Sequence, residues 1–117
     1  MHFLNDQPEN FKVCILLATF NGEKWLEEQL VTLLNQSYQN LDVFISDDHS
    51  TDKTLSLIEN FRIQRANIFL LENSKKKCGS AAQNFFRLLI EVNLLPYKYI
   101  GFSDQDDVWE KEKVNSA

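Results

Sequence analysis

Glycine and cysteine are scarce in this sequence, and each scarcity argues against a class of protein. Only three glycines occur in 117 residues, and none forms a G-x-G-x-x-G pattern, so a dinucleotide-binding Rossmann domain is not expected. The two cysteines, Cys14 and Cys78, are too few for a disulfide framework or a zinc cluster, and they are compatible with a reducing cytosol. Cys14 lies inside an apolar run, where a free cysteine is usually a small core residue.

Basic residues and long apolar runs are also missing. The chain has 12 Lys and Arg against 17 Asp and Glu, for a formal net charge of −5, and its only basic cluster is Lys75-Lys76-Lys77. Nucleic acid is therefore not expected as a partner, because phosphate neutralisation needs a broad basic surface. No apolar stretch approaches the roughly 20 residues that a bilayer demands, and residues 1–12 carry no apolar signal segment.

The remaining composition is that of a folded domain. Hydrophobic residues make up 44% and charged residues 25%, the balance of a soluble globular protein. This length supports one modest core and not two. We therefore divide the chain into a polar amino-terminal extension, 1–12, and a single domain, 13–117.

Apolar segments alternate with helical patterns along that domain. Strands are expected at residues 13–19, 41–46, 68–71 and 97–102, and helices at about 26–34, after residue 51, at 80–92 and from 109 to 114. This alternation predicts an α/β fold of the Rossmann-like, three-layer α/β/α type, with a mainly parallel sheet and right-handed crossovers.

Finer details of the helices also follow from the pattern. Ser50 or Thr51 is expected to cap the second helix, and Glu23 to lie in the first turn of the first helix. The buried stripes are expected to be Leu26, Leu30, Leu33 and Leu34 in the first helix, Leu55, Ile58 and Phe61 in the second, and Phe85, Leu88, Leu89 and Val92 in the third.

Three of the four expected strands lead into polar or acidic residues. These are Thr19-Phe20-Asn21, Asp47-Asp48 and Asp104-Gln105-Asp106-Asp107. Because the carboxyl ends of parallel strands meet at one edge of the sheet, where ligands bind in such folds, the three clusters predict a single site.

The cluster from Asp104 to Asp107 is the strongest chemical feature. Three carboxylates within four residues repel one another, and a cation between them offsets that cost. Oxygen-only ligands favour Mg²⁺ or Mn²⁺, which keep positions open for phosphate oxygens. The alternative is an acidic surface turn whose carboxylates cap a helix.

Two weaker features lie beside it. Asp47-Asp48 either supplies a hydrogen-bond acceptor for a ligand N–H or caps the next helix. The run Lys75-Lys76-Lys77 is either a solvated loop or a source of one ammonium group for a phosphate.

Four motifs follow one another after Lys12. They are Val13-Cys-Ile-Leu-Leu-Ala-Thr-Phe-Asn-Gly-Glu23, Leu33-Leu-Asn-Gln-Ser-Tyr38, Ile45-Ser-Asp-Asp-His-Ser-Thr-Asp52 and Phe102-Ser-Asp-Gln-Asp-Asp-Val-Trp109. Each alone is weak, but in this order and spacing they resemble the amino-terminal, nucleotide-sugar-binding portion of family-2 glycosyltransferases with the GT-A fold. The last motif resembles bacterial rhamnosyltransferase-like members. Ala18 departs from the commoner Pro and Phe20 from the commoner Tyr, and both changes roughly preserve shape.

The resemblance implies roles for individual residues of the first and third motifs. It places Ala18, Thr19 and Phe20 around the base and ribose of a nucleotide, with Glu23 nearby. It gives Asp48 a hydrogen bond from the imide of uracil or thymine.

The later residues are implied to bind the sugar and the metal. Gly79, Asn84 and Gln105 belong to segments that flank the donor. Asp104 and Asp106 match the family's Asp-x-Asp pair, with Asp106 favoured as the direct ligand of a Mn²⁺ or Mg²⁺ that bridges the donor diphosphate.

The implied reaction is metal-dependent, inverting transfer of a sugar from a UDP- or dTDP-linked donor to a glycan or lipid-linked acceptor in surface polysaccharide synthesis. The metal would neutralise charge on the leaving diphosphate. The base that takes the acceptor proton comes in this family from beyond the Asp-x-Asp segment, so no catalytic residue is assigned here. We expect a chain truncated before the acceptor-binding half that binds the donor only. A cytoplasmic location is expected. For the full-length protein this includes peripheral association with the inner face of the plasma membrane.

Other functions compete with this interpretation. The main alternative is a non-catalytic divalent-metal or nucleotide-binding α/β module. Phosphatases resembling haloacid dehalogenases also place Asp-x-Asp after a parallel strand, but they require Thr where Val108 stands. Receiver domains carry their acidic pair after the first strand, where this chain has Thr19-Phe20-Asn21.

Overall fold

The chain alternates strands and helices as the sequence predicts. The computed structural model describes residues 12–35, 40–72 and 76–104, without the side chain of Asp104. The elements are β1 (Val13–Thr19), α1 (Leu26–Leu34), β2 (Leu41–Asp47), α2 (Thr54–Gln64), β3 (Ile68–Leu70), α3 (Ala81–Glu91) and β4 (Tyr99–Asp104).

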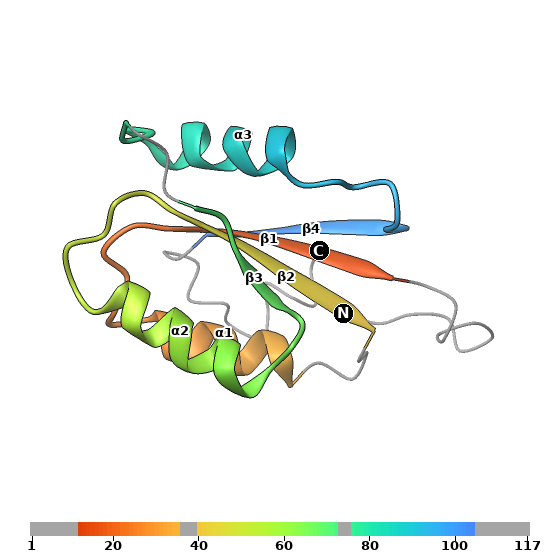
Figure 1. Ribbon diagram of the computed structural model, residues 1–117, viewed down its shortest axis with the longest axis horizontal. Coiled ribbons are helices and arrows are strands. Elements are labelled where there is room, and N and C mark those ends of the chain that lie inside the picture. The colour runs from red at the N-terminus through yellow and green to blue at the C-terminus, as the bar shows by residue number, and fades with distance from the viewer. Residues whose placement is uncertain (1–11, 36–39, 73–75, 105–117) are drawn as a thin grey trace.

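The four strands form one sheet between two layers of helices. Their order is β3-β2-β1-β4, and every pairing is parallel. Figure 1 shows α1 and α2 against one face of the sheet and α3 over the other. The predicted three-layer α/β/α fold with a parallel sheet is confirmed.

The strand order places a topological switch point between β1 and β4. From β1 the chain winds through β2 to β3 on one side, and it then crosses the opposite face by way of α3 to pair β4 with the other edge of β1. Right-handed crossovers require the two sets of helices to lie on opposite faces. Open α/β sheets bind ligands outside the carboxyl ends of the strands at such a point.

β1 is the central strand of this arrangement and buries all seven of its side chains. Successive side chains point to opposite faces, so Ile15 and Leu17 join the core under α1 and α2, whereas Leu16 and Ala18 join the core under α3. This double burial explains why its sequence is a continuous apolar run rather than an alternating one.

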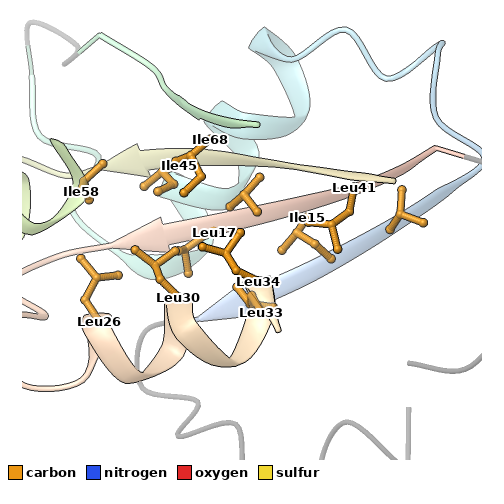
Figure 2. Packing of buried hydrophobic residues seen from close by; sticks show 12 residues of the cluster. Ile15, Leu17, Leu26, Leu30, Leu33, Leu34, Leu41, Ile45, Ile58 and Ile68 are labelled. Carbon is orange, nitrogen blue, oxygen red and sulfur yellow. The ribbon is translucent and has the colours of Figure 1, made fainter. Parts of the chain in front are cut away.

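The larger core fills the space between the sheet and the helices α1 and α2 (Figure 2). The expected stripes of both helices are confirmed, with Ile58 fully buried and Leu55 and Phe61 packed partly buried beside it. Under α3 the expectation is wrong at one position. Leu88 is fully buried, but Leu89 is 40% exposed, because one further residue rotates a side chain by about 100° around the helix axis.

Some element boundaries differ from the sequence expectation. Helix α2 begins at Thr54, and its N-cap residue makes no side-chain cap hydrogen bond; the predicted cap by Ser50 or Thr51 is wrong, because the Ser50 hydroxyl bonds to Asp47 instead. Helix α1 begins at Leu26, so Glu23 lies in the preceding turn rather than in the first helical turn.

The last strand is displaced by two residues from its predicted position. β4 covers Tyr99–Asp104, so Asp104 is the final residue of the strand, whereas the predicted strand ended two residues before it. Tyr97 precedes the strand, and its hydroxyl donates to Asp42 Oδ2 at 2.6 Å. The helix expected at 109–114 lies outside the described residues. Within the described ranges, no helix has the length and apolar character needed to cross a membrane.

The two isoleucines of α2 provide a matched test of this packing. Ile58 is fully buried and Ile63 is 82% exposed. We expect Ile58→Ala to lower the free energy of unfolding by about 2–5 kcal/mol and Ile63→Ala to change it by less than about 0.5 kcal/mol. Urea titration followed by circular dichroism measures both, and equal losses would contradict the assigned faces of the helix.

The two thiols should differ in reactivity for the same reason. Burial, with the charge of Asp42 as a smaller cause, raises the pKa of the Cys14 thiol to about 12, whereas Cys78 is partly exposed. Because the thiolate is the reactive form, Ellman's reagent at about pH 8 should label Cys78 and leave Cys14 unlabelled until the chain unfolds. In Cys78→Ser the native reaction should vanish, and rapid labelling of that variant would show that Cys14 is accessible.

Candidate functional site

The carboxyl ends of β1 and β2 are joined by a buried polar contact. Thr19 and Asp47 are register partners, and the Thr19 hydroxyl donates to Asp47 Oδ1 at 2.7 Å. The backbone N–H and the hydroxyl of Ser50 donate to the same carboxylate at 2.9 and 2.6 Å. Three donors thus satisfy a carboxylate that lies almost entirely out of solvent.

The loops that leave these strands are held together by further side-chain contacts. The N–H of Asn21 donates to Ser50 Oγ at 2.8 Å, and Asn21 Oδ1 accepts the N–H of Thr51 at 2.8 Å. The N–H of Gly22 donates to Thr54 Oγ1 at 2.8 Å. The turn after β1 is therefore built against the turn after β2. Asn21 and His49 both have positive φ values, of 47° and 56°, in the left-handed region that tight turns use.

Glu23 and Asp52 add further hydrogen bonds between the same two turns, close to the starts of α1 and α2. The N–H of Glu23 donates to Asp52 Oδ2 at 3.2 Å, and Glu23 Oε1 accepts the N–H of Lys53 at 3.5 Å. Desolvation opposes ionisation of Asp52, but hydrogen bonds from the side chain and backbone of Thr54 and from the Glu23 backbone outweigh it and lower the pKa of Asp52. The small stabilisation from these bonds is present above the ordinary value of 3.8 and is lost as the pH falls through the lowered pKa.

Asp48 ties the loop before α3 to the same edge. Its backbone N–H donates to the Thr19 carbonyl at 2.9 Å. Its carboxylate accepts the N–H of Cys78 at 2.6 Å and that of Gly79 at 3.0 Å, one on each oxygen. Gly79 has φ of +92°, which a residue with a side chain adopts only with strain. Asp48 is 6% exposed, so most of its surface is covered by the protein.

Asn84 is buried beneath these loops and hydrogen-bonds to the ends of both β1 and β2. It is 2% exposed, and its amide N–H₂ donates to the Ser46 carbonyl at 2.9 Å and to the Thr19 carbonyl at 3.3 Å. Its amide oxygen accepts the Ser46 hydroxyl at 2.5 Å. One side chain of α3 thus fixes the backbones at the ends of both β1 and β2.

Phe20 is the exposed element of this edge. It directly follows β1 and is 42% exposed. The ammonium of Lys77 lies over its ring, with Nζ 5.4 Å from the ring centroid. An aromatic face with a cation above it is a surface that suits a nucleobase or ribose near an anionic group.

β4 brings the acidic motif to the same edge. Asp104 is the register partner of Ala18, directly across the switch point. The preceding Ser103 is buried, and its hydroxyl accepts Gln29 Nε2 at 2.7 Å. Gln105 and Asp106 lie outside the described residues, as does the Asp104 side chain, and no group of three potential metal-ligating side chains occurs among the residues that the structure describes.

The structure therefore gathers most of the residues that the sequence singles out. Ala18, Thr19, Phe20, Asp48 and Gly79 lie at the carboxyl edge of the sheet, Glu23 beside them and Asn84 beneath them. The backbone of Asp104 reaches the same edge. Their roles toward a ligand stay predictions.

Comparison with known proteins gives this edge a context. The profile of Glycosyl transferase family 2 matches residues 14–117, nearly the whole domain. The chain belongs to this family. Its sequence is 46% identical over 101 residues to the dTDP-rhamnosyl transferase RfbG of Shigella flexneri, covering 86% of this chain and 35% of that protein.

Other relatives of the family are more distant. A UDP-Glc:alpha-D-GlcNAc-diphosphoundecaprenol beta-1,3-glucosyltransferase, WfaP of Escherichia coli, is 29% identical over 104 residues, covering 89% of this chain and 39% of that protein. The chain thus spans little more than a third of the length of these curated relatives.

Solved structures confirm the GT-A architecture. TarS 1-349 of S. aureus in complex with UDP is 26% identical, with a TM-score of 0.69 over 82% of this chain and 28% of that one. The mannosyltransferase PcManGT of Pyrobaculum calidifontis, in complex with GDP-Man and Mn²⁺, is 23% identical, with a TM-score of 0.65 over 85% of this chain and 29% of that one. The second likeness supports the fold alone.

Sequence reasoning missed the polar network under the site. It did not connect Thr19 with Asp47, or Asn84 with Ser46, and it did not distinguish Lys77 from its neighbours. The signal was present for the first pair, because polar residues at the ends of two consecutive parallel strands are adjacent in the sheet. Nothing in the sequence indicated that Asn84 would be buried beneath both strand ends.

The buried amide of Asn84 yields a prediction about stability. Asn84→Ala should lower the free energy of unfolding by about 2–4 kcal/mol, because it leaves the Thr19 and Ser46 groups without their partner. Gln83→Ala, at an exposed position of the same helix turn, should change it by less than about 0.5 kcal/mol. Denaturant titration of both variants checks this. An Asn84→Ala variant with an unchanged free energy of unfolding would argue against a stabilising role for the Asn84 hydrogen bonds.

Proposed function

We propose that this chain is the donor-binding part of a metal-dependent, inverting glycosyltransferase that takes a sugar from a UDP- or dTDP-linked donor. The observation that carries the proposal is the meeting of the ends of β1, β2 and β4 at one edge, with Ala18 beside Asp104 and Thr19 beside Asp47. Family membership supplies the reaction class, and the relative named as a dTDP-rhamnosyl transferase supports a dTDP- or UDP-sugar.

The nucleoside is proposed to lie along the ends of β1 and β2. The exposed ring of Phe20 offers a stacking face. The Thr19 carbonyl is fixed by the Asn84 amide and by the Asp48 N–H, so the end of β1 is in place before the ligand arrives. Each oxygen of Asp48 accepts one backbone N–H and keeps a further lone pair that suits the imide N–H of uracil or thymine.

The diphosphate is proposed to lie toward β4 with a Mn²⁺ or Mg²⁺ held by Asp104 and Asp106. The donor set fits such an ion, because carboxylate oxygens are what hard divalent cations prefer, and the Asp104 backbone lies across the switch point from Ala18. The metal, when bound, would stabilise charge on the leaving diphosphate. Gln105 and Gly79 are proposed to flank the sugar.

The acceptor and its activation are proposed to belong to sequence that the relatives carry outside the matched third. The name of the E. coli relative specifies a diphosphoundecaprenol-linked acceptor, and a glycan or lipid-linked acceptor in surface polysaccharide synthesis is proposed here as well. Such an acceptor would place the protein in the cytoplasm at the inner face of the plasma membrane. On this proposal residues 1–117 bind the donor and transfer no sugar.

Calorimetric titration of the chain with UDP, dTDP and GDP, with Mn²⁺ and with EDTA, tests the proposal. We expect binding of UDP or dTDP that requires Mn²⁺ and that weakens at least about tenfold in Asp106→Ala, because one metal ligand is lost. Glu59→Gln is the control, because it removes a carboxylate from an exposed position on α2, and it should bind like the wild-type chain.

Two outcomes would count against the proposal. A folded chain that binds none of the nucleotides would contradict the donor site. Binding that is indifferent to EDTA and to Asp106→Ala would contradict the metal while leaving a nucleotide-binding module as the function.

A further inference from the structure

The loop that precedes α3 carries a lysine in a defined place at the nucleotide edge. Of the run Lys75-Lys76-Lys77, the ammonium of Lys77 lies over the ring of Phe20, 5.4 Å from its centroid. Phe20 is the residue that directly follows the central strand. The sequence left open which lysine of the run serves the site, and the geometry places Lys77 over the ring at the end of β1.

The position of Lys77 depends on hydrogen bonds between the two residues that follow it and the buried carboxylate of Asp48. The next two residues of the chain, Cys78 and Gly79, each donate a backbone N–H to the carboxylate of Asp48. Asp48 in turn is held at the end of β1 by its N–H bond to the Thr19 carbonyl at 2.9 Å. The residue next to Lys77 in the chain is therefore hydrogen-bonded to Asp48 at the end of the sheet. From this position the side chain of Lys77 extends over the ring of Phe20.

An anionic ligand would give this ammonium a stronger contact than the aromatic one that it makes in the described part of the chain. Three other cations of the described part form ion pairs with carboxylates: Lys12 with Asp42, Arg62 with Glu59 and Arg87 with Glu91. The ammonium of Lys77 lies instead over an aromatic ring. Such a contact is weak at an exposed site, and a charge-assisted hydrogen bond to a phosphate oxygen is stronger.

We propose that Lys77 is a donor-binding residue whose ammonium contacts the diphosphate of the bound nucleotide. In the free chain the ammonium rests on the ring of Phe20. When a nucleoside diphosphate binds, the ammonium moves to a diphosphate oxygen and leaves the ring face to the base or ribose. This inference rests on the proposed function and adds a protein cation to the phosphate site.

The experiment compares two lysines of one loop. Lys77→Gln, Lys77→Arg and the charge-matched control Lys76→Gln are titrated with UDP or dTDP, whichever the wild-type chain binds better, in the presence of Mn²⁺. The corresponding nucleoside, which lacks phosphate, is titrated by NMR. Both lysines are exposed, so the variants should fold, and circular dichroism verifies this.

Lys77→Gln should weaken nucleoside diphosphate binding by about tenfold or more, the loss of one charge-assisted hydrogen bond. It should leave nucleoside binding unchanged or slightly tighter, because the ring is uncovered. Lys77→Arg should retain most of the affinity, and Lys76→Gln should lose no more than about twofold, as expected for a general charge effect.

Equal losses in Lys77→Gln and Lys76→Gln would overturn the inference while leaving the donor site intact. The same conclusion would follow if Lys77→Gln weakened the nucleoside as much as the diphosphate, because the lysine would then act on the base pocket alone. A wild-type chain that is folded and binds no nucleotide would overturn the proposed function, and this inference with it.

Discussion

A strand that is covered on both faces can offer a ligand only its end, and β1 is such a strand. All its side chains are buried, with Leu17 in one core and Leu16 in the other. Burial on both faces fixes its register against β2 and β4, because a shift along either neighbour would break ladder hydrogen bonds and misalign two cores at once. The placement of Asp47 beside Thr19 and of Asp104 beside Ala18 is thus a consequence of apolar packing, although the residues concerned are polar.

The same packing brings carboxylates into places where water is largely excluded. Asp47 and Asp48 are consecutive and both buried, an arrangement that is costly unless donors surround each group. Neighbouring segments supply those donors. Ser50 and Thr19 donate to Asp47, and the backbone N–H groups of Cys78 and Gly79 donate to Asp48. Each carboxylate therefore fixes a loop, and the rigidity of the edge follows from the need to satisfy buried charge.

The sequence predicted the strands, the layers and the edge where the polar residues meet, because these depend on periodicity and on the direction of parallel strands. It failed where the outcome depends on three-dimensional competition for a side chain. Serine is a common helix cap, but the Ser50 hydroxyl instead donates to Asp47 Oδ1 and accepts the N–H of Asn21. Leu89 has the hydrophobicity of a core residue, but α3 covers the sheet with a narrow stripe through Leu88. The burial of Asn84 under two strand ends depends on the close approach of α3 to the sheet, which the sequence pattern does not specify.

The hydrogen bonding of this edge also argues against a metal at the two carboxylates that follow β2. Asp47 already accepts three donors, and Asp48 accepts a backbone N–H on each oxygen. A divalent cation at either carboxylate would compete for the oxygens that hold the loops, and any donor that it displaced would be left buried and unpaired. The acidic motif after β2 therefore builds the loops of this edge, and our proposal accordingly assigns the cation and the diphosphate to the motif after β4, whose backbone reaches the edge where Ala18 faces Asp104.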